Sequence, residues 1–338
     1  MTQRPVGVLG AGSWGTALAV HAARSGHRVL LWSRSLAQVE ELQRGRNARY
    51  LPSLLLPAGI TATSKLEEVA SADPLILAVP SHAFRGVLAD LFAASDRAHT
   101  ATVVSAAKGI EEQTLLRMSE VSSEESSRAG VPSSFAVLSG PSFAEELIAG
   151  TPTAVVVASA DGEVASRLQR ELSAANLRLY TSSDVVGVEL GGATKNVVAI
   201  AAGTVAGLGY GHNTMAALLT RGLHEIARLG VAFGGDPRTF SGLAGMGDLV
   251  LTCTGAMSRN RRTGVELAKG RSVGEIATEL GSTAEGVRNA ASIAALAHRR
   301  GVEMPITEQM VAVMHHGKAP RIAVDELMGR GLKPEAEW

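Results

Sequence analysis

A glycine-rich turn near the start of the chain constrains the fold more than any other feature. Residues 10–15 read G-A-G-S-W-G, after an apolar run from Val6 to Leu9 and before an alanine-rich run from Thr16 to Arg24. In a strand–turn–helix unit, the first glycine makes the turn, the second admits a pyrophosphate and the third lets helix and strand pack. The helix N-terminus adds N–H groups and partial positive charge. The pattern predicts an α/β dinucleotide-binding domain of the Rossmann type, with a doubly wound sheet.

The end of the next strand bears on which dinucleotide is bound. This strand is expected at 28–32, and a site specific for NAD would place a carboxylate just after it, for the ribose 2′-OH. Ser33 and Arg34 stand there instead. An arginine suits a 2′-phosphate, which favours NADPH (NADP), with NADH (NAD) also used. The alternative is a solvated loop arginine.

Further strands are expected to end at the same edge of the sheet, where ligands of such folds bind. One ends on Lys108, which is either at the mouth of the cleft or merely solvated. Another ends in the turn that carries Gly140 and Ser142, where the serine would cap a helix or donate to a phosphate. Segments 153–158 and 178–180 are expected to complete the parallel sheet, and the Ser/Glu-rich segment 120–133 to be an exposed connection.

The sequence changes character near Asp184, where long Ala- and Leu-rich helical patterns begin. A chain of 338 residues exceeds what one core usually serves. We therefore expect a dinucleotide-binding domain over 1–183 and an all-helical substrate-binding domain over 184–338.

One lysine lies in the most apolar helix of this second part, at 188–203. Burial would disfavour the charge of Lys195 and lower its pKa, which would let it exchange protons near neutral pH. The alternative is a lysine whose stem packs while its amine reaches water. Asp248, flanked by glycines, is either a helix N-cap or the carboxylate partner that such a lysine needs.

A basic turn follows at 258–262, with the sequence S-R-N-R-R. Guanidinium groups beside Ser258 and Asn260 at a helix start suit a phosphate dianion better than a carboxylic acid. The alternative is a solvated basic turn.

Composition excludes other classes of partner. Lys+Arg and Asp+Glu are both 32 and aromatic residues make up 4%, which argues against nucleic acid and an anionic membrane. The apolar run 197–208 is too short to span a bilayer, the strand at Val6 leaves no room for a signal peptide, and the single cysteine suits a reducing compartment. A cytoplasmic protein is expected. His315-His316 lacks further ligands at metal spacing, so no metal site is expected.

Taken together, these motifs resemble the bacterial-type NAD(P)-dependent glycerol-3-phosphate dehydrogenase family. The resemblance rests on G-A-G-S-W-G-T at 10–16, A-K-G at 107–109, S-G-P-S at 139–142, A-T-K-N at 193–196, G-D-L at 247–249 and S-R-N at 258–260. The order and separations match from about Val6 to Gly317.

The resemblance implies reversible conversion of sn-glycerol 3-phosphate to dihydroxyacetone phosphate, running mainly toward glycerol phosphate for phospholipid synthesis. It gives Lys195 the proton transfer, with Asp248 and Lys108 assisting. It implies substrate contacts for Lys108, Gly140, Ser142, Lys195, Asp248, Ser258, Arg259 and Asn260. The glycine turn already assigns Gly10, Gly12 and Gly15 to the cofactor, and the resemblance adds Ser13, Trp14, Arg34, Tyr50, Lys108, Ala144, Arg259 and Glu285. The sequence departs from the family pattern at Thr283, two residues before Glu285, where the family more often has valine. A homodimer is reasonable because the second domain is apolar.

Two alternatives remain at this point. A reductase of another short hydroxy acid would have no use for residues 258–262. A nicotinamide-sensing regulator would bind NADPH without oxidising it, and would leave Lys195 and Asp248 unexplained.

Overall fold

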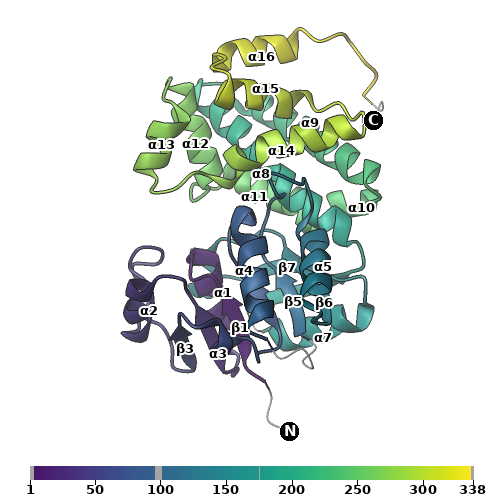
Figure 1. The fold of residues 1–338 in the computed structure, drawn as a ribbon. Coiled ribbons are helices and arrows are strands. Elements are labelled where there is room, and N and C mark those ends of the chain that lie inside the picture. Colours follow the sequence, from purple (N-terminus) through teal and green to yellow (C-terminus); the bar gives the residue numbers. More distant parts are fainter. Residues whose placement is uncertain (1–3, 96–100, 175, 336–338) are drawn as a thin grey trace. The chain divides into compact units, whose positions relative to one another are not determined.

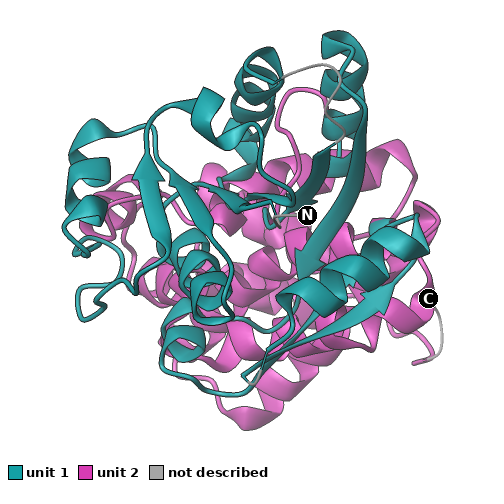
Figure 2. Cartoon of the chain, turned by 90° about the horizontal axis from the view of Figure 1, so that it is seen from below, with its two compact units in different colours: residues 1–107, 116–185 teal, residues 108–115, 186–338 magenta. Residues whose placement is uncertain are grey.

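The computed structural model describes residues 4–95, 101–174 and 176–335. The chain forms two compact units, shown in teal and magenta in Figure 2. The first unit contains residues 1–107 and 116–185, and the second contains 108–115 and 186–338. The short segment 108–115 therefore belongs to the second unit although the first unit flanks it in sequence.

The first unit is built on one eight-stranded sheet, in the order β3-β2-β1-β4-β5-β6-β7-β8. Its strands are β1 (Val6–Leu9), β2 (Val29–Trp32), β3 (Ile60–Thr63), β4 (Leu75–Leu77), β5 (Ala101–Ser105), β6 (Ser133–Ser139), β7 (Thr153–Ala158) and β8 (Leu177–Ser182). In register, Val8 of β1 pairs with Leu31 of β2 and with Ile76 of β4. Both neighbours are parallel to β1, and the strand order runs outward from β1 in both directions, which confirms the predicted doubly wound sheet.

Two strands, β7 and β8, depart from the predicted parallel arrangement. β7 pairs antiparallel with β6, and β8 is parallel to β7. The connection from β6 to β7 contains only the five-residue helix α6, Ala144–Ile148. A helix rises 1.5 Å per residue, so α6 is too short to carry the chain back along the seven-residue strand β6. The chain reverses direction instead.

Helices cover the sheet of the first unit (Figure 1). They are α1 (Ser13–Arg24), α2 (Leu36–Gln43), α3 (Leu66–Val69), α4 (Ser81–Ala93), α5 (Met118–Ala129), α6 and α7 (Gly162–Leu172). The expectation of an exposed connection at 120–133 was wrong, because α5 occupies most of it. Val121 and Glu125 of this helix are buried, and Arg117 with Glu120 form a capping box at its start.

Apart from loops and the segment 108–115, the second unit consists of helices over the described residues. They are α8 (Val185–Gly207), α9 (His212–Ala232), α10 (Pro237–Phe240), the π-helix η1 (Leu243–Gly247), α11 (Asp248–Thr254), α12 (Arg259–Ala268), α13 (Val273–Glu279), α14 (Glu285–Arg299), α15 (Pro305–His315) and α16 (Pro320–Met328). The prediction of an all-helical second domain is confirmed.

Helix α8 is the core helix of this unit. At 23 residues it is longer than the apolar run suggested, and it is apolar enough to cross a membrane, but 89% of its apolar window is buried inside the protein. Its glycines allow backbone contact with α12: a Cβ on Gly203 would lie 1.9 Å from the carbonyl oxygen of Arg261, and one on Gly264 would lie 1.9 Å from that of Ile200. This contact fixes the start of α12 relative to the middle of α8.

Candidate functional site

The glycine turn of the first unit forms an open cradle between β1 and α1. Gly10 has φ +109°, and a Cβ there would lie 2.6 Å from the carbonyl oxygen of Ala78. A Cβ on Gly15 would lie 1.9 Å from the carbonyl oxygen of Gly10, so helix and strand pack closely. A Cβ on Gly12 meets nothing within 4 Å, and no side chain caps the helix that starts at Ser13. The cradle therefore fits a dinucleotide pyrophosphate.

Two amides that the sequence did not single out hold this turn in place. The carbonyl oxygen of Ala11 accepts from Nδ2 of the buried Asn47 (3.0 Å) and from Nε2 of Gln38 (2.7 Å). Asn47 also donates to Oγ1 of Thr16, 2.8 Å away. These bonds fix the glycine turn at 10–15. They join segments more than 25 residues apart, so no local sequence pattern predicts them.

Other predicted cofactor residues lie around the cradle. Ser13 Oγ donates to the carbonyl oxygen of Tyr50 at 3.3 Å, and Trp14 packs half-buried against the core. Arg34 is exposed after β2, and the guanidinium of Arg49 lies over the ring of Tyr50. An exposed guanidinium at this place is compatible with a 2′-phosphate.

The turn after β6 contains a glycine with positive φ that lies close to the neighbouring strand β7. Gly140 has φ +136°, and a Cβ there would lie 3.0 Å from Cα of Val155. Ser142 does not cap α6, because Phe143 occupies the N-cap position and Ser142 Oγ donates to the carbonyl oxygen of Gly140 at 3.0 Å. Ala144 is the first residue of α6 and is buried.

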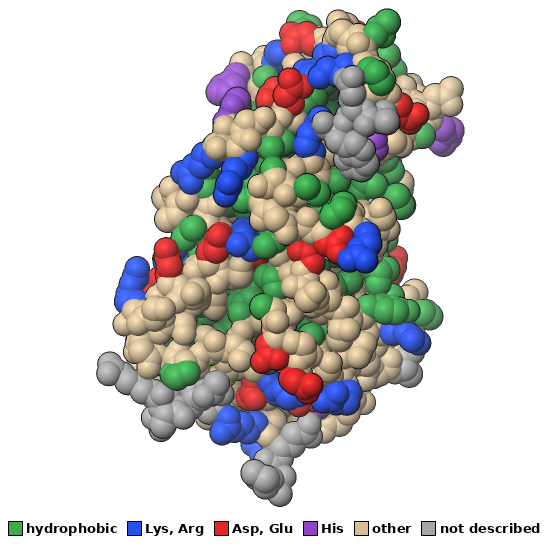
Figure 3. All heavy atoms as spheres, turned by 90° about the vertical axis from the view of Figure 1, so that its right-hand side faces the viewer, with side chains coloured by type: hydrophobic (Ala, Val, Ile, Leu, Met, Phe, Trp, Pro, Cys, Tyr) green, Lys and Arg blue, Asp and Glu red, His purple; other side chains and the backbone are tan. Residues whose placement is uncertain are grey.

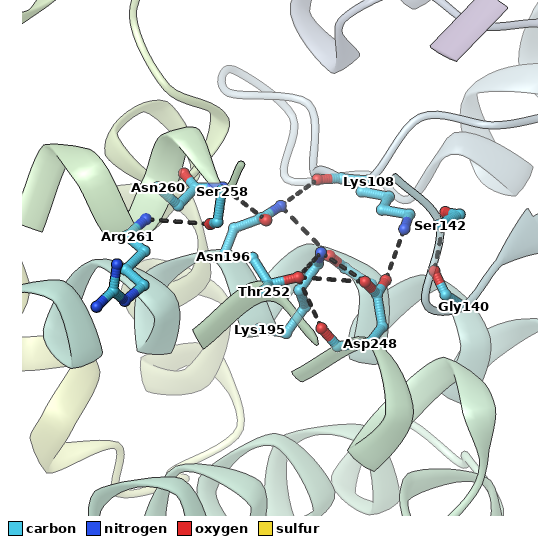
Figure 4. Close-up of polar contacts among 11 residues, drawn as sticks. Lys108, Gly140, Ser142, Lys195, Asn196, Asp248, Thr252, Ser258, Asn260 and Arg261 are labelled. Atoms are coloured by element: carbon cyan, nitrogen blue, oxygen red, sulfur yellow. Dashed lines mark hydrogen bonds and ion pairs between the residues drawn. The ribbon is translucent and has the colours of Figure 1, made fainter. Parts of the chain in front are cut away.

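A buried ion cluster joins three segments of the second unit (Figure 4). Lys195 Nζ donates to Oδ1 of Asp248 (2.7 Å) and to Oγ1 of Thr252 (2.6 Å). Lys108 Nζ donates to Oδ2 of the same carboxylate at 2.6 Å. Lys195 is 5% exposed and Asp248 is 1% exposed. The contact predicted between Lys195 and Asp248 is confirmed, and the alternative of a lysine that reaches water is wrong.

The charges of this cluster explain its pKa values. Burial lowers the pKa of Lys195 to about 8, against the opposing charge of Asp248, and the nearby charge of Lys108 lowers it further. Burial acts to raise the pKa of Asp248, but the charges and hydrogen bonds of both lysines outweigh it, so that pKa is lowered. Asp248 is therefore a carboxylate that two lysines share, and Lys195, with its pKa of about 8, is protonated at neutral pH.

One N–H of Lys195 remains for a ligand. An ammonium has three donors, and among the described residues Lys195 donates to two oxygens. Thr252 has its own donor occupied, because its hydroxyl donates to the carbonyl oxygen of Asp248 at 2.6 Å. Thr252 was missed at the sequence level, although it lies one helical turn after Asp248 on α11.

The basic turn at the start of α12 is connected to this cluster. Asn260 Nδ2 donates to Oδ1 of Asn196 at 2.9 Å, and the backbone N–H of Gly286 donates to Oδ1 of Asn260 at 3.0 Å. Asn196 Nδ2 in turn donates to the carbonyl oxygen of Lys108 at 3.2 Å. The side-chain amides of Asn196 and Asn260 thus link the backbone of Lys108 to the start of α14. Asn196 is next to Lys195 on α8, and Gly286 follows Glu285, the first residue of α14.

The remaining members of the turn differ in their contacts. Ser258 is buried and caps the helix by accepting from the backbone N–H of Arg261 at 3.1 Å. Arg259 Nη1 donates to Oγ of Ser282 at 2.9 Å. Arg262 is exposed. The guanidinium groups lie at a helix N-terminus, the arrangement that binds phosphate in many proteins.

Cys253, the neighbour of Thr252, does not belong to the reactive set. It is fully buried, and burial raises the pKa of its thiol to about 12. A thiol in that state is neither a nucleophile nor a metal ligand at neutral pH. Within the described ranges, no three His, Cys, Asp or Glu side chains are grouped to hold a metal ion.

Comparison with known proteins connects these features to one family. Residues 5–165 match the family model of the NAD-dependent glycerol-3-phosphate dehydrogenase N-terminus, and residues 184–325 match that of its C-terminus. The chain is 50% identical to the glycerol-3-phosphate dehydrogenase [NAD(P)+] of Geobacter sulfurreducens, over 99% of each chain. It is 52% identical to that of Geobacter metallireducens, over 98% of each chain. A crystal structure of glycerol-3-phosphate dehydrogenase from Coxiella burnetii matches with a TM-score of 0.91 and 40% identity, over 97% of this chain and 99% of the other.

Proposed function

The chain belongs to the NAD-dependent glycerol-3-phosphate dehydrogenase family, and from that premise we propose that it interconverts dihydroxyacetone phosphate and sn-glycerol 3-phosphate. NADPH or NADH is the coenzyme, and bound nicotinamide supplies the hydride in the reductive direction. The observation that carries the proposal is the buried ammonium of Lys195, which contacts Asp248 and Thr252 and keeps one donor for a substrate oxygen.

Lys195 acts as the proton donor in reduction and the acceptor in oxidation. As a ketone is reduced, negative charge grows on its oxygen, and a positioned ammonium both stabilises that charge and delivers a proton. A lysine with its pKa lowered to about 8 is protonated at pH 7 but gives up its proton more readily than one in water. The pKa of Lys195 therefore suits a general acid that works near neutral pH.

Asp248 and Lys108 assist without transferring the proton. Asp248 holds Lys195 by an ion pair in a site from which water is largely excluded, where electrostatic interactions are strong. Lys108 shares that carboxylate and adds a second positive charge toward the substrate oxygen. Removing a charge from such a set weakens the stabilisation of the transition state.

The basic turn at 258–260 is proposed to bind the substrate phosphate. Ser258 and Asn260 are fixed by hydrogen bonds at the start of α12, and Arg259 follows the N-cap. Binding the phosphate at a remote site orients the ketone, and that binding energy can be used at the reacting carbon. Gly140 and Ser142 keep the substrate role that the family resemblance implies.

The first unit is proposed to hold the coenzyme. Gly10, Gly12 and Gly15 form the cradle for the pyrophosphate, and Arg34 is placed for a 2′-phosphate. The remaining proposed contacts, all implied by the family resemblance, are Ser13, Trp14, Tyr50, Lys108, Ala144, Arg259 and Glu285. Residues 1–183 are proposed as the dinucleotide-binding domain and 184–338 as the substrate-binding domain.

The cellular setting is also part of the proposal. We expect the enzyme to act in the cytoplasm as a homodimer and to run mainly toward glycerol phosphate, the precursor of phospholipids. Charges of both signs are interspersed on the face in Figure 3, which suits a small-molecule enzyme better than one that binds nucleic acid.

The proposed function is tested by an absorbance assay of reduced nicotinamide. NADPH and NADH are each offered with dihydroxyacetone phosphate and with unphosphorylated dihydroxyacetone. We expect oxidation of a coenzyme with the phosphorylated ketone and far slower oxidation with the unphosphorylated one. Equal rates with both ketones would favour a reductase of another short substrate, and coenzyme binding without oxidation would favour a sensor.

A further inference from the structure

The segment Lys108–Leu115, here called the crossing segment, is anchored in the helical unit by its apolar side chains. The chain leaves β5 at Ser105, joins the second unit at Lys108 and returns to the first at Leu116. Ile110 is fully buried and Leu115 nearly so, in the core that contains Ile293 of α14. The backbone that carries the Lys108 side chain is thereby tied to α14.

Asn289 holds the start of this segment on both sides of Gly109. Its Nδ2 donates to the carbonyl oxygen of Lys108 at 3.2 Å, and its Oδ1 accepts from the backbone N–H of Ile110 at 3.4 Å. Nδ2 also approaches Oε2 of Glu285 at 3.5 Å. Asn289 lies one helical turn after Glu285 on α14 and is 0% exposed.

A buried side-chain amide destabilises the folded protein unless its N–H and C=O groups have hydrogen-bond partners. Ala290 and Ile293 beside it are apolar and fully buried, and an unpaired buried amide costs about 1–3 kcal/mol. The bonds of Asn289 are directed at the backbone on either side of Gly109, directly after the Cα of Lys108. The position of that Cα sets where a long, flexible lysine side chain can place its amine.

We propose that Asn289 is a positioning residue of the reaction: it fixes the backbone of Lys108 so that the Lys108 ammonium meets Asp248. This inference rests on the proposed function. Asn196, which donates to the same carbonyl oxygen from α8, supplies the second anchor. Together the two amides tie Lys108 to the helix that carries Lys195 and to the helix that begins at Glu285.

The proposal is tested by a double-mutant cycle between Asn289→Ala and Lys108→Ala. Misplacing a catalytic group by about 1 Å commonly costs up to ~10²-fold in rate, so we expect Asn289→Ala to lower kcat for ketone reduction by roughly 10- to 100-fold. In the Lys108→Ala background the same substitution should change kcat by no more than about twofold, because contacting residues in one network are not additive. An equal loss in both backgrounds would overturn the proposal.

A matched control separates positioning from stability. Met310 on α15 is buried in the same core, and its apolar side chain has no N–H or O–H to donate. Met310→Ala creates a cavity and lowers the unfolding midpoint, but should leave kcat within about threefold of wild type. If Met310→Ala loses as much activity as Asn289→Ala at the same loss of stability, Asn289 is merely structural.

Two further readouts respond only to the proposed role. The charge of Lys108 lowers the pKa of Lys195, so its displacement in Asn289→Ala should raise that pKa and move the alkaline limb of the kcat profile to higher pH. Hydrogen exchange of the peptide 108–115 should be faster in Asn289→Ala than in Met310→Ala, because Ile110 loses its acceptor. The exchange result is independent of turnover, so it decides the anchoring even if the proposed substrate is wrong. Unchanged exchange would refute it.

Discussion

The substitution Asp248→Asn is the most informative test of the buried cluster. It keeps the shape of the side chain that both lysines contact and removes its negative charge. Asp248 lies 2.7 Å from Lys195 Nζ and 2.6 Å from Lys108 Nζ, and is 1% exposed. Breaking a buried pair costs ~3–5 kcal/mol if the remaining ion stays charged. Since one pKa unit is about 1.4 kcal/mol, the Lys195 pKa should fall from about 8 to roughly 4–6.

The assay is the pH profile of kcat for reduction of dihydroxyacetone phosphate, from about pH 5 to 10. The wild-type enzyme should lose activity as pH rises through about 8, when Lys195 loses its proton. In Asp248→Asn this limb should move to lower pH, and turnover near neutral pH should fall by about 10²-fold. Glu266→Gln is the control, because Glu266 also pairs with two cations, Lys269 and Arg271, but at the surface, where solvent screens the charges. A limb in Asp248→Asn that stays in place or moves to higher pH would refute the reasoning.

Three further predictions concern other parts of the chain. Gly12→Ala should fold normally but bind NADPH at least ~10-fold more weakly in calorimetry, since its Cβ enters the open cradle. Gly15→Ala should instead lower the unfolding midpoint, because its Cβ meets the Gly10 carbonyl. Equal effects of the two substitutions would contradict the proposed pyrophosphate cradle. Arg259→Ala should raise KM for dihydroxyacetone phosphate by ~10-fold or more while the slow rate with dihydroxyacetone stays unchanged, and a loss with both ketones would argue against a phosphate contact. Burial raises the pKa of Glu225 from 4.5 to about 7, so between these pH values the folded protein keeps a proton that the unfolded chain loses. The free energy of unfolding should therefore fall as pH rises from about 4.5 to 7, by up to roughly 3 kcal/mol. Denaturant unfolding of Glu225→Gln should lack this pH dependence, and an identical dependence in both proteins would exclude Glu225 as its source.

The parts of the site that sequence could predict are those with a strong local signal. The glycine turn stands between an apolar strand and a helix, and Lys195 is the lone cation in an apolar helix, so each is conspicuous. Asp248 was predicted as a partner by charge alone, since a buried ammonium requires a carboxylate. The two residues are 53 positions apart, and no local pattern connects segments so widely separated.

The parts that were missed depend on contacts between distant segments. Asn47 and Asn289 are amides whose roles appear only when the loops they hold are seen, because an asparagine in a helix or loop has many ordinary uses. The reversed direction of β7 has no sequence signal, since side-chain alternation is the same in parallel and antiparallel strands.

Helix α5 is a different case, because its signal was present. Met118, Val121, Ser122 and Glu125 are buried at helical spacing, but most of the helix is Ser or Glu, and this composition led to the prediction of an exposed connection. Glu125 is buried because Arg85 of α4 pairs with it, at 2.6 Å. A buried ion pair of this kind cannot be read from one segment alone.

Turnover by Lys195→Met tests the central claim most directly. Methionine keeps most of the buried volume of the side chain but has no proton to give. We expect NADPH to bind with nearly wild-type affinity, and kcat for reduction of dihydroxyacetone phosphate to fall by ~10²–10⁴-fold. A variant that binds the coenzyme and keeps near-normal turnover would show that the proton comes from another group.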